Sequence, residues 1–219
     1  MNAERTGLLI AFEGIDGTGK STQIRFLAAT LAQQGHPVVV TREPTDGPYG
    51  RQIRALFTSR DEISPARELE LFMADRREHV REVVGPALRA GKIVLTDRYY
   101  LSTAAYQGAA GQDPEAIIAA NETFAPVPDL VLLLTMTPAQ SIHRISVLRG
   151  EALNDFEQES SLTRVAAIFA ALDRPYIARI DGAGPIEQVR REVAARVGRL
   201  LDERFAGGRD RAGMTGDCT

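Results

Sequence analysis

The chain is poor in several residue types, and each shortage excludes a class of protein. It has 219 residues, one cysteine, three histidines and no tryptophan. The lone cysteine, Cys218, excludes an internal disulfide framework and favours a reducing, cytoplasmic location. With so few cysteines and histidines, the sequence also argues against a structural zinc site.

Long apolar runs are missing as well. No stretch approaches the roughly 20 apolar residues that cross a bilayer, so no membrane span is expected. Residues 1–6 are polar and lead directly into an apolar run, which is unlike a signal peptide. A net charge of −3 and a pI of about 5.7 argue against a general nucleic-acid binder.

Lysine is scarce although positive charge is not, since Lys20 and Lys92 are the two lysines among 26 lysines and arginines. Arginine supplies nearly every other positive charge, so each lysine needs its own explanation. Lys92 precedes an apolar run and is interpreted as a solvated charge at a strand end. Lys20 lies in a motif that requires lysine.

Short apolar runs alternate with helical patterns in the remaining sequence, which is 44% hydrophobic. Near-continuous apolar runs predict strands covered on both faces, at residues 8–12, 38–40, 93–95, 130–134 and 176–180. Helical spacing predicts helices that include residues 24–31, 69–87 and 185–205. The alternation indicates a doubly wound α/β domain over residues 1–205, followed by a disordered tail at 206–219.

The loop after the first predicted strand carries the most informative motif. Residues 14–21 read GIDGTGKS and fit G-x-x-x-x-G-K-[ST], between a predicted strand and a predicted helix. Glycines let backbone N–H groups turn toward phosphate oxygens, and the helix N-terminus adds partial positive charge. Lys20 can reach the β- and γ-phosphates, and the Ser21 hydroxyl can ligate Mg²⁺. The motif predicts nucleotide binding, and the lack of an Asn-Lys-x-Asp sequence weighs against a GTPase.

Acids and arginines follow the next two predicted strands. Arg42 and Glu43 end one strand, and Asp97 and Arg98 end the other. Ligands of open α/β sheets bind at the carboxyl ends of strands, so these side chains are expected beside the phosphate loop. Asp97 suits Mg²⁺ or its water shell, and Arg98 suits a phosphate. The alternative is a pair of strand-end salt bridges without a ligand.

Arg76 falls on the apolar stripe of a predicted helix, one turn after Phe72. A buried arginine needs partners. Two explanations remain open: an internal carboxylate, or a pocket in which Phe72 stacks on a planar base and Arg76 donates hydrogen bonds to it.

These motifs together resemble the thymidylate kinase family. The resemblance extends from Leu8 to about Leu201, through FEGIDGTGKST (12–22), TREP (41–44), LFMADRREHV (71–80) and DRYYLSTAAYQG (97–108). It implies the P-loop nucleoside-monophosphate-kinase fold, in which helices flank a five-stranded parallel sheet. It also implies a homodimer that phosphorylates dTMP with ATP and Mg²⁺.

The resemblance assigns roles to residues of this sequence. The ATP site would comprise Gly14, Ile15, Asp16, Gly17, Thr18, Gly19, Lys20, Ser21 and Thr22. The dTMP site would comprise Asp16, Arg42 (or Arg51), Pro44, Phe72, Arg76, Arg98, Thr103, Tyr106 and Gln107. Mg²⁺ or its water shell would contact Ser21, Glu43 and Asp97. Tyr106 would pack where a ribose 2′-hydroxyl lies and so favour deoxyribose.

A lid over ATP is expected at residues 150–156, after a helix over 138–149. In this family a phosphate loop without an internal arginine goes with a catalytic arginine in the lid. Arg149 is the first candidate and Arg144 the second, and the alternative for Arg149 is a helix C-terminal cation. Glu157 matches an acid that can approach the acceptor.

Two stretches depart from the family pattern. Residues 154–157 (NDFE) lack the usual lid arginine at Asn154, and residues 43–51 replace the usual Glu-Pro-Gly-Gly. Both departures fall near the lid and the acceptor phosphate.

Four residues are expected to carry the reaction: Lys20, Asp97, Arg98 and Arg149. A phosphate acceptor is largely dianionic at pH 7, so positioning and charge neutralisation suffice without a strong base. Two alternatives remain, a kinase of another nucleoside monophosphate on the same fold and a non-catalytic P-loop switch.

Overall fold

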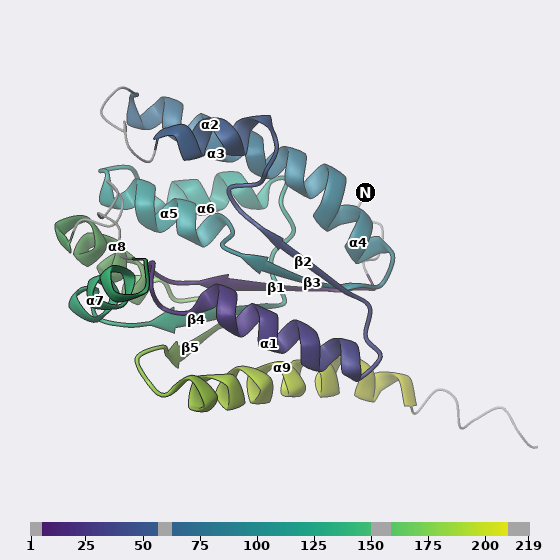
Figure 1. Cartoon of the computed structure of the whole chain (residues 1–219). Helices are drawn as coiled ribbons and strands as arrows, with labels where there is room; N and C mark the ends of the chain where they lie inside the picture. Colours follow the sequence, from purple (N-terminus) through teal and green to yellow (C-terminus); the bar gives the residue numbers. More distant parts are fainter. Residues whose placement is uncertain (1–5, 57–62, 150–158, 210–219) are drawn as a thin grey trace, which may run out of the picture.

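The computed structural model describes residues 6–56, 63–149 and 159–209, without the side chains of residues 148–149 and 205–209. Strands and helices alternate along the chain (Figure 1). They are β1 (Leu8–Glu13), α1 (Lys20–Gln33), β2 (Val38–Arg42), α2 (Pro48–Ala55), α3 (Pro65–His79), the π-helical turn η3 (Val80–Val84), α4 (Gly85–Arg89), β3 (Ile93–Asp97), α5 (Tyr100–Ala109), α6 (Pro114–Glu122), β4 (Leu130–Thr135), α7 (Pro138–Arg149), α8 (Glu159–Ala171), β5 (Ile177–Asp181) and α9 (Ile186–Arg209).

All the strands belong to one parallel sheet in the order β2-β3-β1-β4-β5. This confirms the predicted fold class, and each predicted strand is present. Every strand runs one or two residues past its predicted apolar end, to Glu13, Arg42, Asp97, Thr135 and Asp181. The polar residues that close the strands therefore lie along one edge of the sheet, because carboxyl ends of parallel strands meet there.

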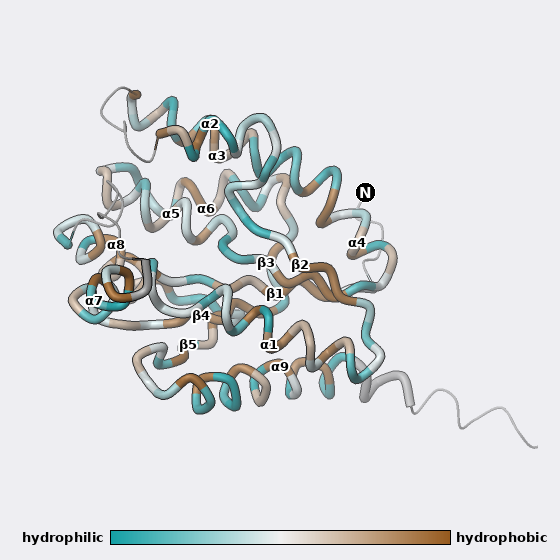
Figure 2. The backbone as a smooth tube through the Cα atoms, in the orientation of Figure 1, coloured by the Kyte–Doolittle hydropathy of each residue, from teal (hydrophilic) through white to brown (hydrophobic). Residues whose placement is uncertain are grey.

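Alternate residues of the central strand face two separate helical layers. Leu8, Ile10 and Phe12 pack in a cluster with residues of α1 and α9. Leu9 and Ala11 pack with residues of α4, α5, α6 and α8 on the other face. Figure 1 places α1 and α9 below the sheet and the other layer above it, and Figure 2 shows the hydrophobic strands between them. Burial on both faces is the reason for the continuous apolar runs.

The long helix predicted over residues 69–87 is interrupted. It consists of α3, the wider turn η3 and α4. Pro86 has no N–H for the carbonyl of Glu82, and its ring would collide with that carbonyl in a regular helix. A π-turn relieves such a conflict locally. Gly85 fits the same turn, because a Cβ there would lie 2.8 Å from the Val80 carbonyl oxygen.

Other boundaries also differ from the prediction. Helix α9 continues past residue 205 to Arg209, into the segment predicted as a tail. Helices α2, α5, α6 and α8 were not predicted, whereas α7 has the bounds that the resemblance implied. No helix in the described ranges is both long and apolar enough to cross a membrane.

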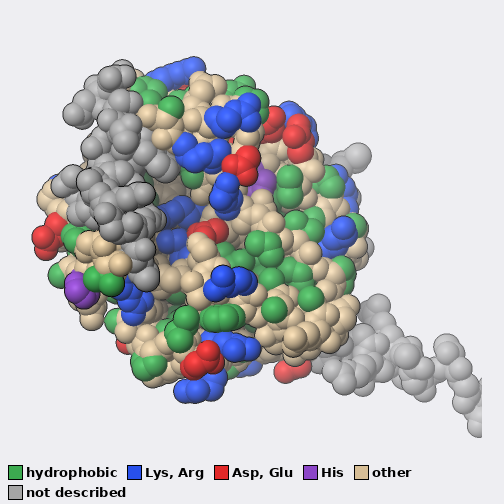
Figure 3. Space-filling model, viewed as in Figure 1, with side chains coloured by type: hydrophobic (Ala, Val, Ile, Leu, Met, Phe, Trp, Pro, Cys, Tyr) green, Lys and Arg blue, Asp and Glu red, His purple; other side chains and the backbone are tan. Residues whose placement is uncertain are grey.

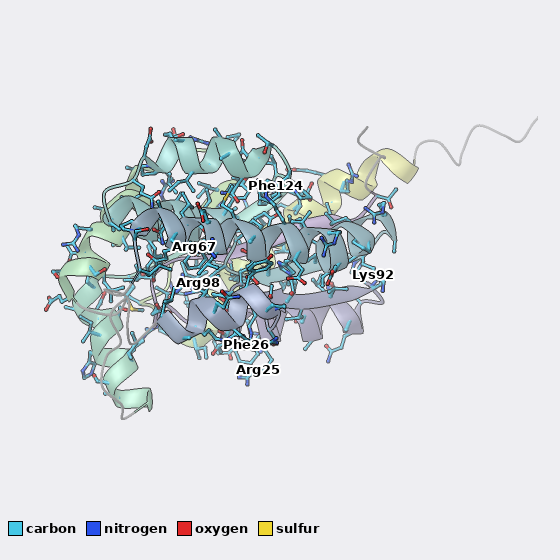
Figure 4. The ribbon with its side chains drawn as sticks, turned by 90° about the horizontal axis from the view of Figure 1, so that it is seen from above. Arg25, Phe26, Arg67, Lys92, Arg98 and Phe124 are labelled. Atoms are coloured by element: carbon cyan, nitrogen blue, oxygen red, sulfur yellow. The ribbon has the colours of Figure 1, made fainter. Side chains whose placement is uncertain are left out.

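The two lysines lie at opposite ends of the sheet. Lys92 is exposed and directly precedes β3, whereas Lys20 opens α1 beside the carboxyl ends of the strands. Figure 4 shows Lys92 at one end of the molecule and Arg98, which follows β3, in its middle. The interpretation of Lys92 as a solvated strand-end charge is confirmed.

Candidate active site

The phosphate loop joins β1 to α1 through three glycines with left-handed backbones. The φ angles are 131° at Gly14, 76° at Gly17 and 93° at Gly19, which is the N-cap of α1. A Cβ at Gly14 would lie 2.3 Å from the Leu134 carbonyl oxygen, so no other residue fits there. The strand–loop–helix context that the motif required is therefore present.

Lys20 is 6% exposed and lies folded over the loop. Its ammonium donates hydrogen bonds to the carbonyl oxygens of Gly14 and Ile15, both at 3.0 Å. Burial and the neighbouring Arg98 charge lower the pKa of Lys20 to about 8, against the opposing effect of Asp16. At neutral pH Lys20 is mostly charged and suits a polyphosphate.

Ser21 and Asp97 meet where a phosphate-bound metal would lie. The Ser21 hydroxyl donates to Asp97 Oδ2 at 2.5 Å. Both are oxygen ligands of the kind that Mg²⁺ prefers, so this pair fits the ion. Within the described ranges, no group of three His, Cys, Asp or Glu side chains could hold a metal. Phosphate oxygens and water would complete the coordination.

Glu43 is less suited to a metal than the sequence predicted. It is buried, and both its oxygens are already used by cations or donors of α3. Oε2 accepts from Arg76 Nε at 2.9 Å and from Arg76 Nη2 at 2.5 Å, while Oε1 pairs with His79 Nδ1 at 2.8 Å. Burial alone would raise the pKa of Glu43, but the Arg76 charge and the His79 hydrogen bond outweigh burial and lower it. These hydrogen bonds use three of the roughly four acceptor positions of the carboxylate, which leaves little of it for direct metal ligation.

Arg76 is 1% exposed, and the sequence left two explanations for it, an internal carboxylate or a base-binding pocket. An internal carboxylate does hold it, in Glu43. Its guanidinium also donates to Asn121 Oδ1 at 2.7 Å and to Thr103 Oγ1 at 2.9 Å. Within the described part of the chain these bonds use four of its five N–H groups and leave one on Nη1.

The other residues expected around the base lie on α3, which carries Arg76, and on α5, which carries Thr103. Phe72 is half-buried on α3, one turn before Arg76. Thr103 and Gln107 are buried on α5. Gln107 Oε1 accepts from Gln112 at 3.0 Å, and its Nε2 is buried without a hydrogen-bond partner among the described residues.

Arg98 occupies a backbone conformation that is unusual for its residue type. Its φ is 69°, and it is the one non-glycine residue of the described ranges with a positive φ. Such outliers cost conformational energy and concentrate at functional sites. The Arg98 N–H donates to the Phe12 carbonyl at 2.9 Å, and its own carbonyl accepts from the Thr96 hydroxyl at 2.8 Å.

The Arg98 guanidinium is held by four groups at the mouth of the phosphate loop. It donates to the Gly14 carbonyl at 3.1 Å, Ser102 Oγ at 3.0 Å, Asp16 Oδ1 at 2.8 Å and the Tyr106 hydroxyl at 3.3 Å. The Tyr106 hydroxyl in turn donates to Asp16 Oδ2 at 3.1 Å. Burial opposes ionisation of Asp16, but the Arg98 and Lys20 charges prevail and hold the pKa of Asp16 well below its usual range.

A second group of arginines surrounds Asp46. Arg42 donates two hydrogen bonds to this carboxylate, Arg54 donates one at 3.1 Å, and Arg51 donates to the Asp46 carbonyl at 2.6 Å. The Arg42 hydrogen bonds and charge lower the pKa of Asp46. Sequence reasoning missed Arg54, which lies one helical turn beyond Arg51 on the unpredicted α2.

These elements enclose a cleft of about 350 Å³. Its lining consists of Asp16, Gly17, Gly19, Lys20, Ser21, Thr22, Arg42, Glu43, Pro44, Arg54, Asp97 and Arg98. Figure 3 shows Lys and Arg side chains gathered on this face, with acidic side chains among them. A groove of about 710 Å³ adjoins the cleft over β2 and α3 and shares Ser21, Arg42 and Asp97 with it. The cleft unites the loop motif and both strand ends, as predicted from the sequence.

The predicted lid lies outside the described residues, as do Asn154 and Glu157, and the side chain of Arg149 is not described. Arg144 is described, and it donates to the carbonyls of Gly182 and Ala183 at 2.8 and 3.1 Å. It thereby ties α7 to the turn that follows β5.

Three buried polar residues near the site were not assigned a role from sequence. Asp75 accepts from the backbone N–H and hydroxyl of Thr45, at 2.9 and 2.5 Å, and so anchors the loop after β2. His79 pairs with Glu43 and, through Nε2, with Thr41 Oγ1 at 2.7 Å. Glu13 is the third.

Comparison with known proteins identifies the family. A family model described as thymidylate kinase matches residues 12–193. The thymidylate kinase of Desulfotalea psychrophila (strain LSv54 / DSM 12343) is 52% identical over 195 residues, which cover 89% of this chain and 96% of that protein. The thymidylate kinase of Akkermansia muciniphila is 49% identical over 203 residues (92% and 95%), and that of Xanthomonas campestris pv. campestris (strain B100) is 48% identical over 200 residues (91% and 86%). The chain belongs to the thymidylate kinase family.

Proposed function

We propose that the protein transfers the γ-phosphoryl group of ATP to the 5′-phosphate of dTMP and releases dTDP and ADP. The observation that carries this proposal is the cleft in which Lys20 and Arg98 both donate hydrogen bonds to the Gly14 carbonyl. Two cations that meet at one phosphate loop and line the same cleft suit a donor phosphate and an acceptor phosphate. Family membership supports thymidylate as the acceptor.

ATP would occupy the phosphate loop, residues 14–22. The inward-turned loop backbone, the N-terminus of α1 and Lys20 would bind its phosphates. Ser21 and Asp97 would hold Mg²⁺. When bound, Mg²⁺ supplies charge neutralisation on the phosphate oxygens.

The acceptor would lie between Arg98 and the α3–α5 pocket. Arg98 would face its phosphate, with Arg42 beside it, and Asp16 would contact the sugar hydroxyl. The base would stack on Phe72 and accept from the remaining N–H of Arg76. Pro44, Thr103 and Gln107 would complete the pocket.

Catalysis in this proposal depends on positioning and charge. The acceptor phosphate is largely dianionic at pH 7 and needs no strong base to attack. Lys20 and Arg98 hold the two phosphates in line and neutralise charge as it shifts between them. Arg149 would add a third cation from the end of α7.

Two further properties are proposed on the family resemblance: assembly as a homodimer and a cytoplasmic location. The single cysteine agrees with a reducing compartment.

The acceptor is tested by measuring ADP release with dTMP, dUMP, dCMP, dGMP and dAMP at equal concentration. We expect the highest kcat/KM for dTMP. A higher value for another nucleotide would favour the related monophosphate kinase, and ATP binding without acceptor-dependent ADP release would favour the non-catalytic switch.

Lys20→Ala should abolish phosphoryl transfer, because no other lysine of the described ranges lies at the carboxyl edge of the sheet. Lys92→Ala is the matched control, since it removes the other lysine at the far end and should leave turnover unchanged. Circular dichroism and thermal melting should show that both variants fold. Retained turnover in Lys20→Ala would contradict the phosphate-loop assignment.

Tyr106→Ala should raise kcat/KM for ribonucleotides relative to deoxyribonucleotides, because it removes the ring that blocks the 2′-position. Tyr106→Phe keeps the ring but loses the hydrogen bonds to Asp16 and Arg98, so it should preserve the ratio. Both ratios can be measured with UMP and dUMP as well as with TMP and dTMP. An unchanged ratio in Tyr106→Ala would exclude a role in sugar selection.

Arg149→Ala should lower kcat by roughly 10²-fold, the size typical of a lost transition-state cation. Arg144→Ala should instead lower the melting temperature, because Arg144 ties α7 to the carbonyls of Gly182 and Ala183. An unchanged kcat in Arg149→Ala, combined with a large loss in Arg144→Ala, would transfer the catalytic role to Arg144.

A further inference from the structure

Glu13 is a buried carboxylate to which the proposed mechanism assigns no step. It is the last residue of β1, is 0% exposed and directly precedes Gly14 of the phosphate loop. It does not line the cleft. A carboxylate in this position cannot touch either nucleotide, so its effect must pass through its neighbours.

The side-chain hydrogen bonds that Glu13 makes with described residues all go to the start of α5. Its Oε1 accepts from the backbone N–H groups of Tyr99 and Ser102, at 3.0 and 3.1 Å. Its Oε2 accepts from the Ser102 hydroxyl. The N-cap of α5 makes no side-chain capping bond of its own. Glu13 on β1 therefore accepts from two N–H groups at the start of this helix, and the Ser102 N–H also donates to the Tyr99 carbonyl at 3.1 Å. Burial raises the pKa of Glu13 to about 7, against the opposing effects of the Ser102 hydrogen bond and the Arg98 charge.

Ser102 connects Glu13 to Arg98. Its hydroxyl hydrogen points to Glu13, so an oxygen lone pair faces the guanidinium and accepts from Arg98 at 3.0 Å. The carboxylate thus fixes the direction of the Ser102 hydroxyl. That hydroxyl is one of the four groups that hold the Arg98 guanidinium. Without an acceptor behind it, the hydroxyl could turn its hydrogen toward the guanidinium.

Glu13 also supports the strained backbone at Arg98. The left-handed residue lies between two anchors, its own N–H on the Phe12 carbonyl and the following N–H of Tyr99 on Glu13. Both anchors belong to the carboxyl end of β1. A strained conformation persists only where its surroundings hold it, and β1 supplies that support on both sides.

We propose that Glu13 is a positioning residue that sets the Arg98 guanidinium for the acceptor phosphate, acting through Ser102. The proposal rests on the function proposed above, because it assumes that Arg98 binds the acceptor. It predicts that changes at Ser102 affect acceptor binding separately from ATP binding, since the contacts of Lys20 with the loop do not involve Ser102. The Glu13 charge also acts on Lys20, so the Ser102 variants carry the main test.

The principal experiment compares Ser102→Ala with Ser102→Thr in steady-state assays with dTMP and ATP. Ser102→Ala should raise the KM for dTMP about tenfold, the size of a lost hydrogen bond to a charged group, and change the KM for ATP by less than about twofold. Ser102→Thr retains the hydroxyl and should restore the KM for dTMP to near its original value.

A double-mutant cycle tests the route from Glu13. Glu13→Gln should raise the KM for dTMP by itself but add little in a Ser102→Ala background, because both changes break the same series of hydrogen bonds from Glu13 through Ser102 to Arg98. Glu115→Gln is the matched control. It removes a carboxylate that pairs with Arg174 near the amino end of β5, away from the cleft, and should change neither KM.

The outcomes separate this proposal from a purely structural cap and from the proposed function. A cap alone predicts lower melting temperatures with both KM values unchanged or changed together, and either result overturns the positioning role. Independent, multiplicative effects of Glu13→Gln and Ser102→Ala overturn the route through Ser102.

If Glu13→Gln does not fold, the comparison of Ser102→Ala with Ser102→Thr decides. Failure of the unmodified protein to phosphorylate dTMP would instead refute the proposed function.

Discussion

Charges that leave water have to be paired, and this constraint governs the whole site. Arg76 is enclosed by Glu43, Asn121 and Thr103, and Arg98 by a carboxylate, two hydroxyls and a carbonyl. Lys20 lies on two loop carbonyls. An unpaired charge at any of these places would be costly, so each cation is held in one orientation before a ligand arrives. The pairing that makes burial tolerable also preorganises the cleft.

The central strand connects these pairs. β1 ends at Glu13, immediately before the phosphate loop, and the Phe12 carbonyl and the Glu13 carboxylate hold the turn at Arg98. The Gly14 carbonyl accepts from both Lys20 and Arg98. The donor side and the acceptor side of the cleft are therefore built on adjacent residues of one rigid strand, which fixes their separation more firmly than two loops could.

The second arginine group is held more loosely. Asp46 is 75% exposed at its side chain and draws Arg42 and Arg54 together at the mouth of the cleft. In the proposed reaction a dianionic acceptor would approach these arginines and replace the Asp46 carboxylate as their anionic partner. Exposed pairs of this kind contribute little to stability, so they can rearrange at small cost. The loop that carries Asp46 is also where the sequence departs from the family pattern, and Asp75 anchors it from α3.

The sequence by itself determined the sheet, the phosphate loop and the strand-end acids and arginines, because these follow from periodicity and from a motif with strict backbone requirements. It did not determine the break at Pro86 or the helices α2 and α6, whose signals are short and local. It left the partner of Arg76 open, since Glu43 and Arg76 are 33 residues apart and meet only when β2 packs beside α3. The roles of Glu13, His79 and Arg54 were likewise decided by tertiary structure, because hydrogen bonds depend on which side chains the folded chain brings within about 3 Å, and sequence separation does not record that.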